Sequence, residues 1–288
     1  MDWVDGEESG TPMPLSQSDT EHLLRRVGFG ATPADTAHFA GRELNDVLNE
    51  MFAKSPATPS MPGAASNTHW YTAMLGTVDW WIDRMADVTW VGGANSPSPL
   101  LEKLALFWHS HFACGTGKVR DMRALWRQMV AYWEDGLGDF EDLLQRVMLD
   151  GGMLVYFDNH QNTKGRPQEN LARELMELFT LGEGHYTEDD IKQGARALTG
   201  YFVDDNDFVF VDRAHDKGDD KVILGKGGAL NGDHFVKILL KHEACPRYIA
   251  LKLYRHFVAD VTDDWDLLDT PTRSVVQALA DRLVKERY

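Results

Sequence analysis

Apolar side chains recur every three or four residues through most of this sequence, and Gly or Pro interrupts the pattern at short intervals. Such spacing places apolar side chains on one face of an α-helix, whereas a half-buried strand needs strict alternation. One example of this helical spacing is the series Phe39, Leu44, Val47, Leu48 and Phe52. We therefore expect the chain to fold as many short packed helices.

Caps and helix breakers predict where these helices begin and end. Ser18 followed by Glu21 has the pattern of a capping box and predicts the start of a first helix, which Gly28 ends. Thr32 and Pro33 predict a second helix that runs to about residue 54. Further helices are predicted at 69–89, 99–112, 119–134, 139–149, 167–181, 187–198, 232–241, 246–258 and 272–288.

The segment 201–224 differs from the rest of the chain. Phe208–Val211 and Lys221–Leu224 are short β-rich runs around a Gly-Asp turn, which suggests a small hairpin. The predicted fold class is all-α, a single multi-helix domain over 18–288 with one β-hairpin insertion. Polar composition predicts a disordered tail at 1–17, and loops are predicted at 55–67 and 151–166.

The chain is acidic, with 45 Asp and Glu against 29 Lys and Arg, and a net charge of -16. An acidic surface repels phosphates, so nucleic acid and anionic membranes are unfavourable partners, although the charge can also serve solubility alone. No stretch has the roughly 20 apolar residues of a membrane helix. The cysteines, Cys114 and Cys245, are expected to be free buried thiols.

The prediction of a compartment depends on the N-terminal sequence as it is given. It has no basic start, apolar run or small-residue cleavage site, which are the parts of a secretory signal. As written, the chain is expected to be cytoplasmic. If a signal has been trimmed from it, the protein is exported.

One helix carries a polar stripe that could form a site. In the predicted helix 167–181 this stripe consists of Asn170, Arg173, Glu174 and Glu177, opposite an apolar stripe. The spacing of residues 170, 174 and 177 places them on one face. These side chains could bind a substrate, or the two glutamates could ligate a divalent cation. Alternatively the face is solvated, or Arg25 or Arg26 pairs with the carboxylates and makes the cluster structural.

Two histidines, His109 and His111, lie among aromatic residues in the sequence FWHSHF. In a regular helix they point about 200° apart and cannot bind one metal ion, whereas in an extended segment they share a face. The candidate metal ligands are thus His109, His111, Glu174 and Glu177. The alternative is that one histidine packs against the aromatic rings and the other bonds a carbonyl group.

Further polar candidates lie in the predicted loops. His215 next to Asp216 could form a base oriented by a carboxylate, with Lys221 close by, or it could simply be solvated. Asp158 and Asn162 precede the glutamate-rich helix in a long connection, and loops of that length are often functional. The sequence contains none of the motifs HExxH, GxxxxGK[ST], GxSxG or CxxC.

Several of these segments together resemble the bacterial family called domain of unknown function 1800. They are HLLRRVGFGATP (22–33), EKLALFWHSHF (102–112), residues 153–191 with ARALTGY (195–201), and HDKGDDKVILG (215–225) followed by CPRYIALKLYRHFV (245–258). The resemblance implies a helical domain, often exported and often encoded beside a sulfatase-like companion, with no firmly assigned reaction. Family members usually begin with an export signal and continue well beyond the last segment, so this chain resembles a C-terminally shortened member.

Two functions from different classes follow. The first is an enzyme, hydrolase- or lyase-like, whose catalytic residues would be His109, His111, Glu174, Glu177 and His215. Its substrate would be bound by Asp158, Asn162, Asn170, Arg173 and Lys221, and a divalent metal could assist. The second is a non-catalytic scaffold or partner of the sulfatase-like companion. Convergence of the histidines on the Glu174 and Glu177 face would favour the enzyme.

Overall fold

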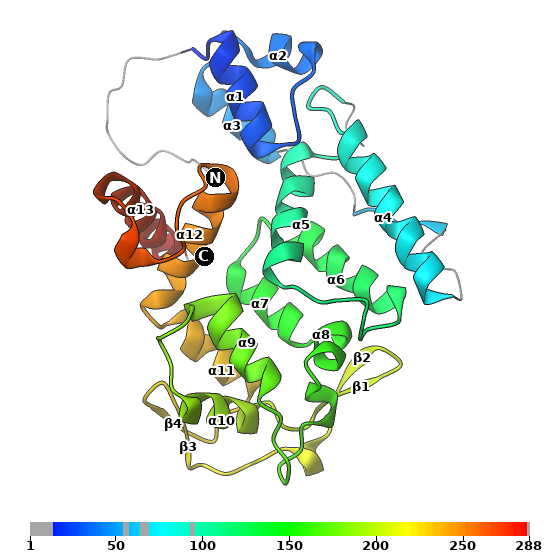
Figure 1. Cartoon of the computed structure of the whole chain (residues 1–288), viewed down its shortest axis with the longest axis vertical. Coiled ribbons are helices and arrows are strands. Elements are labelled where there is room, and N and C mark those ends of the chain that lie inside the picture. The colour runs from blue at the N-terminus through cyan, green and yellow to red at the C-terminus, as the bar shows by residue number, and fades with distance from the viewer. Residues whose placement is uncertain (1–13, 54–57, 64–68, 93–95, 287–288) are drawn as a thin grey trace. The chain divides into compact units, whose positions relative to one another are not determined.

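The computed structural model describes residues 14–53, 58–63, 69–92 and 96–286, and within these ranges the chain is mainly helical (Figure 1). This confirms the predicted fold class. The contacts among its residues divide the chain into two compact units, and each unit is described by itself. Unit 1 consists of Met1–Ala57 and Trp81–Lys103, and unit 2 of Thr58–Trp80 and Leu104–Tyr288. The expectation of one domain over 18–288 stays a prediction.

Unit 1 is held together by a buried carboxylate. It contains α1 (Gln17–Val27), α2 (Pro33–Phe39), α3 (Leu44–Ala53) and adjoining parts of α4 (Trp70–Asp87) and α5 (Pro99–His111). Asp35 of α2 accepts hydrogen bonds from the Thr89 hydroxyl and from the backbone N–H groups of Trp90 and Val91. Burial opposes ionisation of Asp35, but the hydrogen bonds from Thr32 and Thr89 outweigh it and lower the pKa.

The first helix begins earlier than predicted. Its N-cap is Ser16, whose hydroxyl accepts from the backbone N–H of Asp19, rather than Ser18 paired with Glu21. The sequence has two overlapping Ser-x-x-acid patterns here, and the earlier one forms the cap, where the buried Thr20 donates its hydroxyl hydrogen to the Ser16 carbonyl. Gly28 ends the helix, as predicted.

The predicted second helix is two helices, α2 and α3. They are separated at Ala40–Glu43, where Gly41 adopts a φ of 80°. The N-terminal segment pairs with this break, since Gly41 N–H donates to Leu15 and Leu15 N–H donates to Arg42. The break is therefore stabilised by a partner that is distant in sequence, and helical periodicity on either side could not reveal it.

Unit 2 contains the remaining helices and both small sheets. Its α-helices are α6 (Met122–Asp135), α7 (Phe140–Met148), α8 (Gly151–Tyr156), α9 (Asn170–Met176), α10 (Glu188–Ala197), α11 (Gly232–Leu240), α12 (Ala244–Phe257) and α13 (Thr270–Glu286). Short 3₁₀ turns lie at Asn159–Gln161, Asp212–Ala214 and Trp265–Leu267, and a π-turn at Glu177–Leu181. Most predicted helix positions agree with these bounds, and Thr187 with Asp190 caps α10 as predicted.

The β-rich segment forms two hairpins rather than one. The predicted run at 208–211 forms β2 (Asp207–Phe210), which pairs with the preceding strand β1 (Tyr201–Asp204). The second run forms β3 (Lys221–Ile223), which pairs with the following strand β4 (Lys226–Gly228). Each hairpin has a two-residue turn with positive φ at both positions, Asp205-Asn206 and Leu224-Gly225. Turns of this kind match the twist of the flanking strands, which explains why each run pairs with its nearest neighbour.

The two glycines at 151 and 152 begin a helix instead of continuing a loop. Asp150 caps α8 by accepting from the backbone N–H of Met153. A Cβ atom on Gly151 would lie 2.1 Å from the carbonyl oxygen of Asn206, so the glycine permits close approach of the β1–β2 turn.

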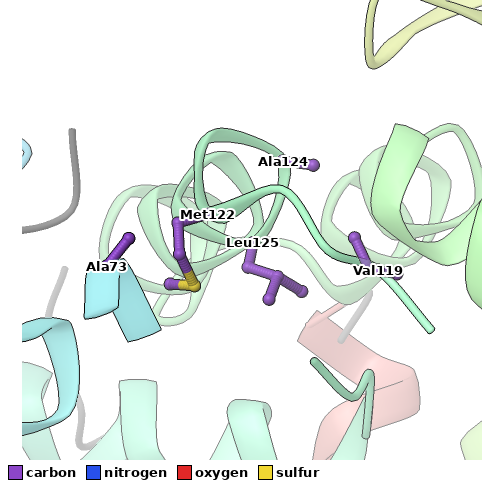
Figure 2. Close-up of a cluster of buried hydrophobic side chains, with 5 residues drawn as sticks. All are labelled: Ala73, Val119, Met122, Ala124 and Leu125. Carbon is purple, nitrogen blue, oxygen red and sulfur yellow. The ribbon is translucent and has the colours of Figure 1, made fainter. Parts of the chain in front are cut away.

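A hydrophobic cluster joins α4 and α6 within unit 2 (Figure 2). Ala73 of α4 is buried with Met122 and Leu125 of α6 and with Val119 just before it. The partly buried Cys114 packs against this cluster as a free thiol, as predicted, and Cys245 is buried.

Some predictions can be checked only in part. Residues 1–13 of the expected tail and residues 55–57 and 64–67 of the expected loop lie outside the described residues. In the ranges that are described, every helix is too short or too polar to cross a bilayer.

Candidate functional site

The glutamate-rich helix widens into a π-turn at its end. Expected from Pro167, α9 instead begins at Asn170, and Glu177–Leu181 then follows π geometry until Gly182 closes it with a φ of 80°. The carbonyl of Phe179 lies 3.1 Å from Nε2 of His111, and that of Leu178 accepts from the Tyr248 hydroxyl at 2.8 Å. The Thr180 hydroxyl donates to the Leu175 carbonyl. Single π-turns inside helices occur frequently at functional sites.

Two carboxylates lie beside this turn in different surroundings. Glu177 accepts a short hydrogen bond from the Tyr186 hydroxyl. Glu174 is half-buried, and in the described part of the chain its carboxylate accepts no hydrogen bond and forms no ion pair. Burial and then the charge of Glu177 raise the pKa of Glu174, while Arg173 opposes the shift. Carboxyl groups in unequal surroundings are typical of acid–base pairs.

The arginine of the stripe turns away from these two carboxylates. Arg173 forms a bidentate pair with Glu188 at 2.8 and 2.9 Å and a longer contact with Glu169. These charges raise the pKa of the Arg173 guanidinium. Arg25 pairs with Glu21 in its own helix. Arg173 therefore forms no ion pair with Glu174 or Glu177.

The two histidines of α5 occupy regular helical positions and pack against aromatic rings. His111 is buried and stacks on Phe107 with centroids 5.9 Å apart, and burial, followed by the charge of Lys252, lowers its pKa to about 3. His109 is half-buried, its centroid lies 6.5 Å from that of Tyr132, and burial lowers its pKa. His111 therefore reaches the π-turn as a neutral ring.

The candidate metal ligands do not form a cluster of three. Across the described ranges, no three His, Cys, Asp or Glu side chains meet in an arrangement that could hold a metal ion. In the regular helix α5, His109 and His111 point in different directions, as the helical alternative required.

Asp158 and Asn170 lie together at the start of α9. Asp158 adopts a left-handed φ of 61° and pairs with Lys118, and the Asn170 side chain donates to it at 3.4 Å. These two predicted substrate-binding residues are therefore neighbours near the glutamate face, with a lysine that sequence reasoning did not include.

Three other predicted residues bond the backbone. Asn162 is buried, donates to the carbonyl of Ala195 and accepts from the N–H of Gln168. His215 lies 2.8 Å from the Thr199 carbonyl through Nδ1. Lys221 is fully buried, and its ammonium donates to the carbonyls of Asp216 and Gly218 at 2.6 Å each. Each of these side chains bonds backbone groups of another segment, and these bonds explain its position without a ligand.

Sequence reasoning missed Tyr186 and Tyr248, which supply the phenols at the π-turn. Neither belongs to the polar stripe of the helix, because Tyr186 follows it in a loop and Tyr248 lies on α12. It also missed Asp150, a carboxylate that lines a pocket elsewhere in unit 2. The N-cap position before two glycines was the one available signal for Asp150.

Fold and site together define a mainly helical protein with a carboxylate–phenol cluster around a widened helix turn. The chain belongs to the family described as protein of unknown function (DUF1800), whose model matches residues 22–288. No curated protein and no solved structure matches the chain.

Proposed function

We propose that this protein is an enzyme of hydrolase- or lyase-like chemistry, in which Glu174 moves a proton beside the π-turn. The observation that carries the proposal is the half-buried Glu174 carboxylate, which has no hydrogen-bond partner in the described chain and a raised pKa. A carboxyl group whose pKa is raised holds its proton more firmly than an ordinary glutamate, which favours a role in proton transfer.

The neighbouring groups support this role. Glu177 is oriented by Tyr186 and places a second carboxylate next to the first. Tyr248 and His111 hold the π-turn through its carbonyls, which positions both glutamates. Asp158, Lys118 and Asn170 are polar groups near the start of the same helix that could orient a substrate. The oxygen-rich pair could also take a divalent cation as an auxiliary.

The test is a comparison of the full chain with its Glu174→Gln variant. Both would be assayed against chromogenic esters, glycosides and phosphate monoesters, with and without Mg²⁺ or Ca²⁺. We expect turnover of one class, a loss of about 10²-fold or more in Glu174→Gln, and loss of one limb of the pH–rate profile. Glu183→Gln, which changes an exposed carboxylate in the following loop, is the matched control.

Equal rates in wild type and Glu174→Gln, or no turnover of any class, would contradict the proposal. The cluster would then be a structural network, as the non-catalytic alternative requires.

A further inference from the structure

A pocket of about 400 Å³ lies in unit 2, and Asp150 is among the residues that line it. It is bounded by α6, α7, the start of α8 and the β1–β2 hairpin, and none of the ten predicted site residues lines it. Its apolar wall includes Ala131, Val147 and Phe208, and its polar groups include Arg127, Arg146 and Asp150. Pockets of this size commonly hold small molecules.

Asp150 is the charged group of this pocket that forms no ion pair, although Arg127 and Arg146 lie near enough to favour its ionised form. It accepts hydrogen bonds from the N–H of Met153 at 2.9 Å and from the Gln128 amide at 3.4 Å, and both end on Oδ1. Among the described residues no hydrogen bond ends on Oδ2, and Asp150 forms no ion pair. Burial raises the pKa of Asp150 to about 6, and it is only partly offset by hydrogen bonds from Met153 and Gly152 and by the charges of Arg127 and Arg146.

Both arginines of the pocket already have carboxylate partners. Arg127 pairs with Asp207 and also donates to the carbonyl of Asn206 at 3.2 Å. Arg146 pairs with Glu134 at 2.8 Å and with Asp135 at 2.5 Å. An anionic ligand would compete with these carboxylates for the guanidinium groups and would face Asp150, whereas a cation would pair with the Asp150 carboxylate, which forms no ion pair of its own in the described chain.

We propose that this pocket binds a small organic cation, a primary or secondary amine on an apolar body, with Asp150 as its counter-ion. The apolar body packs against Ala131, Val147 and Phe208, and the Phe208 ring adds a favourable surface for the ammonium group. The ammonium donates to Oδ2 of Asp150 and offsets the cost of ionising a buried carboxyl group. This inference is independent of the proposed role of Glu174.

The pH dependence of binding follows from the ionisable groups that face Asp150. These are Arg127 and Tyr132 from α6, Arg146 from α7, and Cys114, while Asp207 of β2 pairs with Arg127. Burial raises the pKa of Cys114 to about 12 and that of Tyr132 well above its ordinary value, so neither titrates below pH 8. Asp150 is therefore the group of this set that changes charge near pH 6.

The experiment is isothermal titration calorimetry of the full chain with phenethylamine, hexylamine and N-methylphenethylamine at pH 7.5. Phenylacetate, an apolar body with the opposite charge, is the probe for an anion site. We expect one amine site per chain, no phenylacetate binding, and affinity that weakens about tenfold per pH unit below the Asp150 pKa.

Asp150→Asn should weaken amine binding at least tenfold while keeping the helix cap, because Asn caps helices as well as Asp. Asp139→Asn, at the N-cap of α7 and outside the pocket, is the matched control and should bind as wild type does. Phe208→Ala, on the exposed hairpin, removes the apolar wall and carries the test if Asp150→Asn does not fold. Retained affinity in the folded pocket variants, equal binding of phenylacetate, or no heat with any amine would overturn the proposal.

Discussion

His111 illustrates how one residue can support a site without titrating near neutral pH. Its ring is buried among Phe107, Trp108 and Phe112, and Nε2 meets the carbonyl of Phe179. The sequence predicts these two roles for two different histidines, whereas His111 performs both. Burial is the main reason that its pKa falls to about 3, so the folded protein excludes the proton that an unfolded chain accepts.

This linkage predicts a pH-dependent loss of stability. Between the ordinary value of 6.5 and the folded pKa of about 3, the unfolded chain binds a proton at His111 that the folded chain does not. Stability should therefore fall as pH is lowered through this window, by up to about 1.4 kcal/mol per pH unit from this residue. His111→Phe should cost about 1 kcal/mol at pH 7, through its lost hydrogen bond, and should have a shallower pH profile.

Urea denaturation between pH 7 and pH 4 measures the two profiles. His22→Gln, which changes an exposed histidine, is the control and should keep the wild-type slope. A slope in His111→Phe as steep as that of wild type would contradict this account.

At the scale of elements, the π-turn depends on contacts from outside its own helix. Two of its carbonyl groups bond side chains from other helices, His111 of α5 and Tyr248 of α12. The turn itself contributes the Thr180 hydroxyl, which donates to the carbonyl of Leu175. A widened turn lowers the quality of the helical hydrogen bonds, so partners of this kind are needed to stabilise it. The glutamates are therefore positioned by three separate helices, α5, α9 and α12.

Tyr248→Phe tests this dependence. It removes the donor to Leu178 and should lower the free energy of unfolding by about 1 kcal/mol. Hydrogen exchange of the amides at 177–181 should become faster. Tyr254→Phe changes the same helix at a half-buried tyrosine whose hydroxyl makes no hydrogen bond in the described chain, and it should alter neither measurement. Equal effects of the two substitutions would show that the turn does not depend on Tyr248.

At the scale of the whole molecule, charge is the property that composition determines most directly. The net charge of -16 produces a surface field that repels polyanions, independently of how the two units are arranged. Many of the basic side chains are also held by carboxylates, as Arg146, Arg173 and Arg196 show.

We therefore expect no binding to duplex DNA or single-stranded RNA at 0.15 M salt. Fluorescence anisotropy with labelled 20-nucleotide probes checks this, and a basic DNA-binding protein serves as the positive control. A salt-dependent anisotropy increase at micromolar protein would contradict the expectation.

Helix positions and fold class were predictable because they depend on local periodicity and capping. Thr187 with Asp190, Pro99 and Gly28 all act within one or two turns of their own position. The exceptions arose where a distant segment decides, as when Leu15 pairs at the break between α2 and α3. Similarly, the approach of Asn206 accompanies the helix that begins at Gly151.

The sequence by itself determined the helical architecture, the acidic character and the shared face of Glu174 and Glu177, because each depends on composition or short-range spacing. The tertiary structure alone decided which polar groups have partners. It placed Lys221, Asn162 and His215 on backbone groups, brought Tyr186 to Glu177, and left Asp150 in a pocket without an ion pair among the described residues. Burial and pairing are long-range properties, and a side chain becomes chemically useful or merely structural according to the atoms that folding brings next to it.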